Sequence, residues 1–218
     1  MLFIASNISL TVALILSSTI SMSANAKESA YREPLRNHPK YIEANAQLDA
    51  KDYTNALKNF DLLLKTFTDS AGIYYGRAKA HHEQGNKKSA FDDYTRSINL
   101  NKSSPKALNN RALIYAANGD LKSAISDLGK AIILNPKYDH AYSNRGVAKG
   151  ATGDPQGAMA DFSKAIEINP LYGAAWRNRG ITKELLGDVK GACKDWKRAA
   201  NLGIKECESW LKAQCNEK

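Results

Sequence analysis

Small and apolar residues recur along most of this chain at a fixed spacing of 34 positions. Residues 110–112 read Asn-Arg-Ala, residues 144–146 read Asn-Arg-Gly, and residues 178–180 read Asn-Arg-Gly again. Stepping back by the same interval reaches residues 76–78 and then 42–44. A period of this length is typical of stacked helical or strand units, so we divide the chain into five repeats that start at residues 37, 71, 105, 139 and 173.

Three columns of the repeat predict how its parts pack. Two columns, the eighth and twentieth positions, hold small residues, and the twenty-fourth holds a large apolar one. These columns are Ala44, Ala78, Ala112, Gly146 and Gly180; Ala56, Ala90, Ala124, Ala158 and Ala192; and Phe60, Tyr94, Leu128, Phe162 and Trp196. Small residues let two helices approach closely, and the large side chain fills the space beside them.

Turn signals divide each repeat into two helices. Gly followed by Asp or Asn stands at the fifteenth and sixteenth positions of four repeats, which predicts a helix stop and an N-cap. Pro155 suits the first turn of the helix that follows, and Asn-Pro at 135–136 and 169–170 ends the second helix. One helical hairpin cannot bury its apolar face alone, so stacking into a curved solenoid is expected.

With these columns the chain resembles the tetratricopeptide repeat (TPR) family over about residues 37–204. The resemblance implies an all-α, right-handed α-solenoid of five helix-turn-helix units, at residues 37–70, 71–104, 105–138, 139–172 and 173–203. Residues 204–218 then form a capping helix and tail, with Ile204, Cys207, Trp210 and Leu211 on its apolar face. Lys40, at a usually aromatic position, and a mixed eleventh column depart from the family pattern.

The first 26 residues differ from the rest because they contain no charged residue. An apolar stretch over 2–16 and Ala24-Asn25-Ala26 before Lys27 are typical of a secretory signal peptide, although the usual basic start is missing. We expect an exported protein in the periplasm or another extracytoplasmic compartment, with residues 27–36 as a linker. The alternative is an uncleaved N-terminal segment that associates the protein with a membrane.

Arg at the seventh position faces an Asp sixteen residues later in four repeats. The pairs are Arg77 and Asp93, Arg111 and Asp127, Arg145 and Asp161, and Arg179 and Asp195. The first helix carries the Arg and the second the Asp, so we predict structural ion pairs between the two helices. Repeat one has Glu43 and Asn59 instead and cannot make this pair.

The sixth position is the main candidate for binding. It holds Asn110, Asn144 and Asn178, and in the TPR family the first helices line the concave groove. Family members that bind extended peptides use Asn at this position, where the amide donates to and accepts from the peptide backbone. Further groove positions implied by the resemblance are Lys79, Lys106, Asn109 and Arg177, with His82, His140 and Ser143. These would suit an acidic or backbone-rich partner; the alternative is a solvated face without a ligand.

Other chemistry is not indicated. An oxidising compartment would allow Cys193 to pair with Cys215, the alternative being free buried thiols. We find no motif of a metal site, cofactor site or enzyme, and the Lys-Asn-Asn-Lys-Arg clamp with which some TPR proteins hold a chaperone tail is incomplete. The net charge of +9 is spread over all repeats, so nucleic acid is not an expected partner.

The sequence therefore predicts a non-catalytic, exported TPR scaffold that binds a protein or an extended peptide in its concave groove. Assembly of an envelope or membrane complex is the task that exported relatives imply. The alternative is a structural module that docks by charge on an anionic membrane or wall polymer.

Overall fold

The computed structural model describes residues 35–215 and divides into two compact units, one up to Thr68 and one from Asp69 onward. The described residues form helices and no strands, which confirms the all-α repeat fold. The first unit holds α2 (Pro39–Asp49) and α3 (Tyr53–Leu64). The second holds α4 (Ala71–Glu83), α5 (Lys87–Leu100), α6 (Pro105–Ala117), α7 (Leu121–Leu134), α8 (Asp139–Ala151), α9 (Pro155–Ile168), α10 (Gly173–Leu185), α11 (Val189–Asn201) and α12 (Glu206–Gln214).

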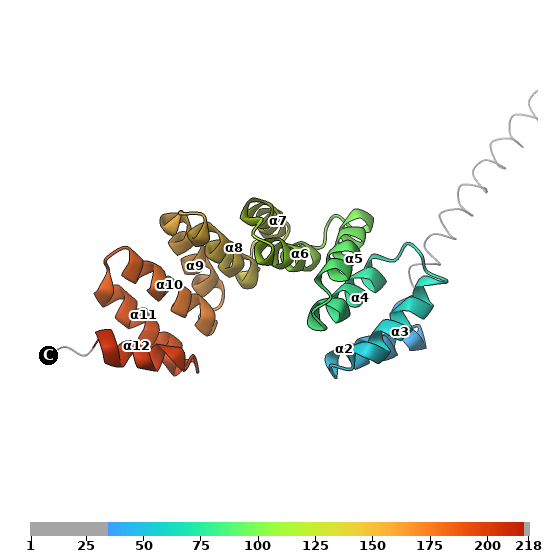
Figure 1. The fold of residues 1–218 in the computed structure, drawn as a ribbon, viewed down its shortest axis with the longest axis horizontal. Coiled ribbons are helices and arrows are strands. Elements are labelled where there is room, and N and C mark those ends of the chain that lie inside the picture. The colour runs from blue at the N-terminus through green and yellow to red at the C-terminus, as the bar shows by residue number, and fades with distance from the viewer. Residues whose placement is uncertain (1–34, 216–218) are drawn as a thin grey trace, which may run out of the picture. The chain divides into compact units, whose positions relative to one another are not determined.

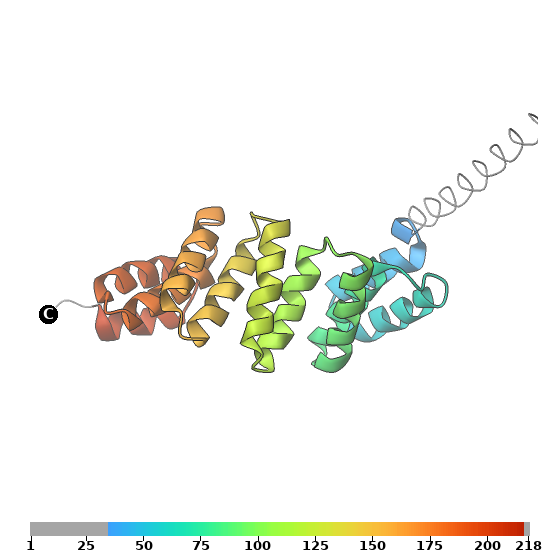
Figure 2. The ribbon, with the colours of Figure 1, turned by 90° about the horizontal axis from the view of Figure 1, so that it is seen from above.

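Helices of the second unit pack in chain order, first helix on second helix and then on the next hairpin (Figure 1). Helix α8 also touches α6 and α10 directly, so successive first helices lie beside one another along one side of the stack. Figure 2 shows the same stack from above. We call the surface formed by α4, α6, α8 and α10 the first-helix wall.

The turn inside each hairpin has the predicted chemistry. Gly85, Gly119, Gly153 and Gly187 all have φ between +81° and +85°, a left-handed conformation that only glycine adopts without strain. In repeats three to five the next residue, an aspartate, caps the second helix: Asp154 accepts from the backbone N–H of Gly157 at 2.8 Å, and Asp188 does the same for Gly191. The side chain of Asn86 in repeat two makes no capping hydrogen bond, so the predicted cap is wrong there. In repeat one Lys51 takes this conformation, with φ of 62°.

The small and large columns meet inside each hairpin, as predicted. All five alanines of the twentieth position are completely buried. The closest approach is in repeat five, where a Cβ added to Gly180 would lie 2.5 Å from the Trp196 ring. Trp196 is itself only 1% exposed, so it has no free space to move into.

Each Arg of the seventh column donates two hydrogen bonds to the Asp on the second helix of the same hairpin. Arg111 donates from Nε and Nη2 to the two carboxylate oxygens of Asp127 at 2.8 and 3.1 Å, and Arg145 binds Asp161 in the same way at 2.8 and 2.7 Å. Equivalent pairs join Arg77 to Asp93 and Arg179 to Asp195. These carboxylates are buried, so each pair is shielded from water.

The same arginines also reach the preceding repeat. Arg111 Nη1 donates to Thr95 Oγ1 on α5 at 3.2 Å, and Arg179 Nη1 donates to Ser163 Oγ on α9 at 3.1 Å. One guanidinium therefore ties together three helices, two of its own hairpin and one of the hairpin before. This fixes the register of neighbouring repeats as well as the geometry inside each one.

The mixed eleventh column also has a structural explanation. Lys149 and Lys183 each place their ammonium 2.9 Å from the buried carboxylate that the Arg of the same repeat already holds. In repeat one, which lacks the Arg–Asp pair, Gln47 at this position accepts a hydrogen bond from Asn59 at 3.0 Å. The column thus supplies a polar partner to the second helix in repeats one, four and five.

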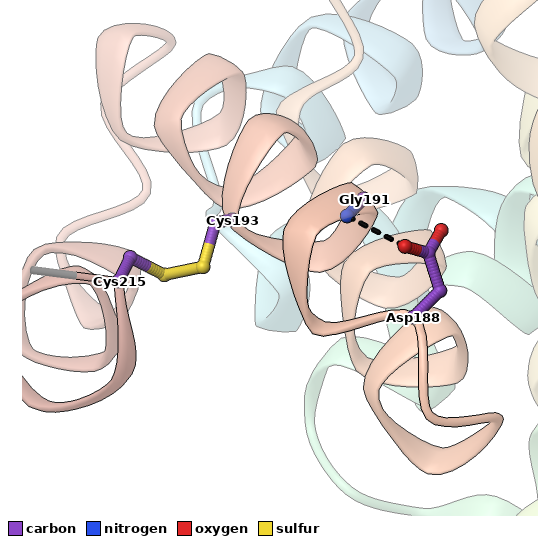
Figure 3. The surroundings of a disulfide bond; sticks show 4 residues. All are labelled: Asp188, Gly191, Cys193 and Cys215. Carbon is purple, nitrogen blue, oxygen red and sulfur yellow. Dashed lines mark hydrogen bonds between the residues drawn. A yellow bond between two sulfur atoms is a disulfide. The ribbon is translucent and has the colours of Figure 1, made fainter. Parts of the chain in front are cut away.

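The last helix closes the stack. Helix α12 lays Cys207, Trp210 and Leu211 on the buried Trp196 of α11. A disulfide joins Cys193 to Cys215, with the two Cα atoms 5.7 Å apart (Figure 3), and Cys207 remains a buried free thiol.

The N-terminal predictions fall almost wholly outside the described residues. The signal peptide (1–26) and most of the linker (27–36) precede residue 35, where the description begins. Within residues 35–215, none of the helices combines the length and apolar character that a bilayer-spanning helix needs.

Substitutions in the Arg111–Asp127 pair test its structural role. Arg111→Met leaves a carboxylate that is 4% exposed without its bidentate partner, and we expect a loss of about 3–5 kcal/mol in the free energy of unfolding. The double variant Arg111→Met/Asp127→Leu removes the charge as well and should recover at least half of that loss. Urea denaturation measures both.

The control is Arg96→Met, which removes an exposed pair with Asp69 and should cost less than about 1 kcal/mol. Equal losses for Arg111→Met and Arg96→Met would contradict the structural role.

Two glycines give a matched test of helix packing. Gly180→Ala pushes a methyl group into Trp196, and we expect destabilisation of about 1–3 kcal/mol despite the higher helix propensity of Ala. Gly150→Ala meets its nearest neighbour at an ordinary 3.7 Å and should stabilise the helix by up to about 1 kcal/mol. Thermal unfolding distinguishes the two; a stabilised Gly180→Ala protein would refute the close packing.

Candidate functional site

The three asparagines of the sixth column lie on the first-helix wall, one each on α6, α8 and α10. They are half-buried and partly held by neighbours. Asn110 donates to Tyr94 Oη at 3.2 Å, Asn144 donates to Asn109 Oδ1 at 2.9 Å, and Asn178 accepts from Arg177 Nε at 3.2 Å. The helix positions and these bonds fix where each amide stands.

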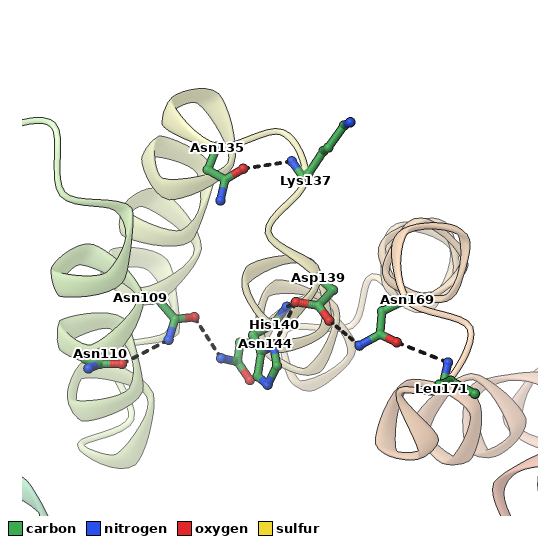
Figure 4. A network of polar contacts seen from close by, with 9 residues as sticks. All are labelled: Asn109, Asn110, Asn135, Lys137, Asp139, His140, Asn144, Asn169 and Leu171. Carbon is green, nitrogen blue, oxygen red and sulfur yellow. Dashed lines mark hydrogen bonds and ion pairs between the residues drawn. The ribbon is translucent and has the colours of Figure 1, made fainter. Parts of the chain in front are cut away.

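Asn109 does not lie on the surface where the resemblance placed it. It is 4% exposed, and both ends of its amide are used: it donates to Asn110 at 3.1 Å and accepts from Asn144 (Figure 4). Asn109 therefore orients the side chains of Asn110 and Asn144. It is a positioning residue, and its predicted role as a groove contact is wrong.

Hydrogen-bonding capacity remains on two of the three asparagines. An amide carries one oxygen acceptor and two N–H donors. Among the described residues, Asn144 Oδ1 and Asn178 Nδ2 make no hydrogen bond with the protein. Asn144 can therefore accept from, and Asn178 donate to, a bound main chain.

Aromatic and polar groups line the wall next to the asparagines, towards the start of the first helices. His140 stacks on Tyr172 with ring centroids 4.6 Å apart and contacts Asp139 through Nδ1 at 2.8 Å. Asn169 donates to the second oxygen of Asp139 at 2.7 Å (Figure 4). Burial acts to raise the pKa of Asp139, but these hydrogen bonds outweigh it and hold the pKa below its ordinary value.

The tyrosines of this region stay neutral across the physiological range. Burial raises the pKa of Tyr138 to about 12. Burial also raises the pKa of Tyr94, where the hydrogen bond with Asn110 opposes it only in part. Tyr138, which is half-buried, therefore offers an O–H group and an aromatic face, both suited to binding a polypeptide. Tyr94 is only 1% exposed, and its hydroxyl serves to hold Asn110 in place.

The other side of the asparagines is aliphatic, which the sequence analysis missed. The ninth position of the repeat carries Leu113, Val147 and Ile181, which are 38%, 52% and 41% exposed. Helix α10 adds Leu185, which is 73% exposed. The signal for it is a column of aliphatic residues 34 apart, which in the sequence looks the same as a column of core residues. We call Leu113, Val147, Ile181 and Leu185 the aliphatic strip.

A pocket of about 220 Å³ opens within this strip, between α8 and α10. Val147, Ile181 and Leu185 line it together with Phe162 and Asn178. Gly150 and Ala151 leave the room that larger side chains would fill. The pocket fits one aliphatic side chain of a ligand.

The predicted basic residues are spread over the wall and do not meet at one point. Lys79 on α4 and Arg177 on α10 are half-buried, and Lys106 at the start of α6 is exposed. Arg177 points its Nε at Asn178. In residues 35–215 no group of three or more His, Cys, Asp and Glu side chains is arranged to hold a metal ion.

Comparison with solved structures places this arrangement among known folds. The structure resembles that of MamA, with a TM-score of 0.66 and 22% identity over 76% of this chain and 96% of MamA. It matches YrrB, described as a TPR protein with an unusual peptide-binding site, with a TM-score of 0.66 and 18% identity over 84% of this chain and 98% of YrrB. The first TPR domain of Spaghetti (RPAP3), bound to an HSP90 peptide, gives 0.52 and 27% over 54% of this chain and 93% of that domain.

Sequence relatives are more distant in coverage. Photosystem I assembly protein Ycf3 of Synechococcus elongatus is 35% identical over 74 residues, which are 33% of this chain and 42% of Ycf3. The chain thus spans less than half the length of the curated relatives it matches. Family profiles described as tetratricopeptide repeat match residues 41–105, 105–138 and 139–170, together more than half of the chain. The chain belongs to the tetratricopeptide repeat family.

Proposed function

We propose that this protein is an exported, non-catalytic scaffold whose first-helix wall holds an extended segment of a partner protein. One observation carries the proposal: each sixth-column asparagine is followed three residues later by a ninth-column aliphatic residue. The pairs are Asn110 with Leu113, Asn144 with Val147, and Asn178 with Ile181. Residues three apart are neighbours on a helix face, so each helix presents one amide beside one exposed apolar side chain.

Such a pair matches the two parts of a peptide. The amide hydrogen-bonds the main chain, which every peptide has, and the aliphatic side chain covers an apolar residue of the ligand. The pairs on α8 and α10 repeat both parts of this match along the wall, and Leu113 on α6 extends its apolar part. The pocket between Val147 and Ile181 then selects for an aliphatic residue at one point of the ligand.

Related proteins support peptide binding as the task. YrrB has a peptide-binding site and the RPAP3 domain holds an HSP90 peptide, as their descriptions state. The description of Ycf3 as an assembly protein supports a role in assembling a protein complex. We place that complex in the envelope or membrane because residues 1–26 have the pattern of a secretory signal.

Aspartate substitutions in the aliphatic strip test the pocket. Dodecapeptides selected from a random phage-displayed library on the full chain serve as probes, and fluorescence anisotropy gives their Kd. Val147→Asp and Ile181→Asp should each weaken binding at least about tenfold, because a carboxylate loses hydration when the ligand covers it. Selected peptides should share an aliphatic residue.

The matched control is Ile133→Asp on α7, an aliphatic residue that is 80% exposed on a second helix. Its Kd should stay within twofold of the unmodified protein. An equal loss of affinity at Ile133 and Ile181 would refute binding on the first-helix wall.

The asparagines are tested together. Asn110→Ala/Asn144→Ala/Asn178→Ala should weaken the same peptides by about 25-fold, from about fivefold for each of the two hydrogen bonds lost at Asn144 and Asn178. The circular dichroism spectrum and the urea midpoint report whether the triple variant is folded. A folded triple variant with unchanged affinity would reject the role of the amides.

A further inference from the structure

The solvent-facing side of α11 carries an uninterrupted row of cations. Lys190, Lys194, Lys197 and Arg198 are all exposed, and their spacing places them on one stripe of the helix. The opposite side of α11 holds the buried Ala192, Asp195, Trp196 and Ala199. We call the four cations the α11 basic stripe.

The same positions of the preceding second helices are mixed in character. They read Lys88, Asp92, Thr95 and Arg96 on α5; Lys122, Ser126, Gly129 and Lys130 on α7; and Gln156, Ala160, Ser163 and Lys164 on α9. A reason is visible at the third of these positions, where Thr95 and Ser163 accept from the Arg of the next repeat. Helix α11 is followed by α12, whose sequence places no arginine against it, and Lys197 occupies the third position.

The stripe also lacks acidic partners. The cation that ends each row on the other helices has one: Arg96 pairs with Asp69 at 2.9 Å, Lys130 lies 3.9 Å from Asp127, and Lys164 pairs with Glu167 at 2.6 Å. In contrast, within the described part of the chain no ion pair involves any residue of the α11 basic stripe. Four uncompensated charges on three turns of helix attract a negatively charged surface.

Exposed aliphatic residues adjoin the stripe at the start of α11. Between the end of α10 and the first residue of α11, Leu186 and Val189 are 38% and 41% exposed. The corresponding residues after α4 are Gln84 and Lys87. The one acidic residue of the apolar turn, Asp188, uses its carboxylate to cap the backbone of Gly191 at 2.8 Å.

A bilayer that contains anionic lipid presents a negatively charged headgroup layer and, beneath it, apolar acyl chains. Cations beside exposed aliphatic residues complement both of these layers. The cations interact with the headgroups, and the aliphatic side chains enter the boundary with the acyl chains. A soluble polyanion would use only the charges. We therefore propose that α11 and the turn before it form a peripheral docking site for an anionic membrane, separate from the peptide-binding wall.

Sedimentation with lipid vesicles tests this site on the full chain. Vesicles of phosphatidylcholine with 30% phosphatidylglycerol are compared with pure phosphatidylcholine, so that any lipid binding by the apolar N-terminal residues is common to both. Lys190→Gln/Lys194→Gln/Lys197→Gln should lose on the order of 100-fold of the binding specific to the anionic vesicles, about fivefold for each cation. Raising NaCl should weaken binding by the unmodified protein.

The control variant Lys87→Gln/Lys88→Gln/Lys122→Gln removes the same charge from exposed positions on α5 and α7 and should stay within a few-fold of the unmodified protein. Equal losses in the two triple variants, or no preference for anionic vesicles, would overturn the proposal.

Leu186→Ser/Val189→Ser separates a membrane from a soluble polyanion. It should weaken binding to anionic vesicles several-fold and leave binding to heparin unchanged, because heparin offers no apolar layer. Unchanged vesicle binding by this variant would overturn the membrane as the partner and favour a polyanion.

Discussion

The bidentate Arg–Asp pair between the two helices of a hairpin is the constraint on which the second unit depends. Its geometry allows one relative placement of the two helices, since both carboxylate oxygens of Asp127 or Asp161 must meet the fork of one guanidinium. Arg111 and Arg179 also bond to the second helix of the preceding hairpin, so the position of each hairpin relative to the one before it is fixed as well. Close packing at Gly180 and Trp196 then leaves little freedom for the helices to slide.

The functional surface follows from that register. When successive repeats are held in equivalent positions, residues 34 apart stand in a row on adjacent helices. The row of asparagines and the row of aliphatic residues therefore run side by side along the first-helix wall. A peptide can meet several equivalent pairs at once, and the gain in affinity comes from their number. The α11 basic stripe fits the same logic, because α12 follows α11 and supplies no arginine of the kind that binds Thr95 on α5 and Ser163 on α9.

Much of the fold was predictable because its signals are local or strictly periodic. Glycine followed by aspartate or asparagine marks the turns of repeats two to five, and the seventh-column Arg and its Asp keep a constant separation within one hairpin. The buried position of Asn109 was not predictable, since it depends on the distance between α6 and α8 rather than on the sequence of either helix. The pairing of Lys149 and Lys183 with buried carboxylates was not predictable for a related reason: it depends on which side chains of the second helix lie beside the eleventh position.

The candidate site also has a part that the sequence predicts and a part that only the structure shows. Residue type identified Asn110, Asn144 and Asn178, because three amides at one repeat position are conspicuous among varied neighbours. The aliphatic strip escaped notice because Leu113, Val147 and Ile181 look like core residues in the sequence, and only their exposure distinguishes them. Exposure of an apolar side chain on a repeat protein is set by the curvature of the stack, which the sequence of one helix does not contain.

Nuclear magnetic resonance during titration with a selected peptide tests the two-sided wall most directly. The side-chain amides of Asn144 and Asn178 and the methyl groups of Val147 and Ile181 should shift together and report a single Kd, while the methyl groups of Ile133 on α7 stay in place. Shifts confined to second helices, or different Kd values for the amides and the methyl groups, would contradict a single peptide site on the first helices.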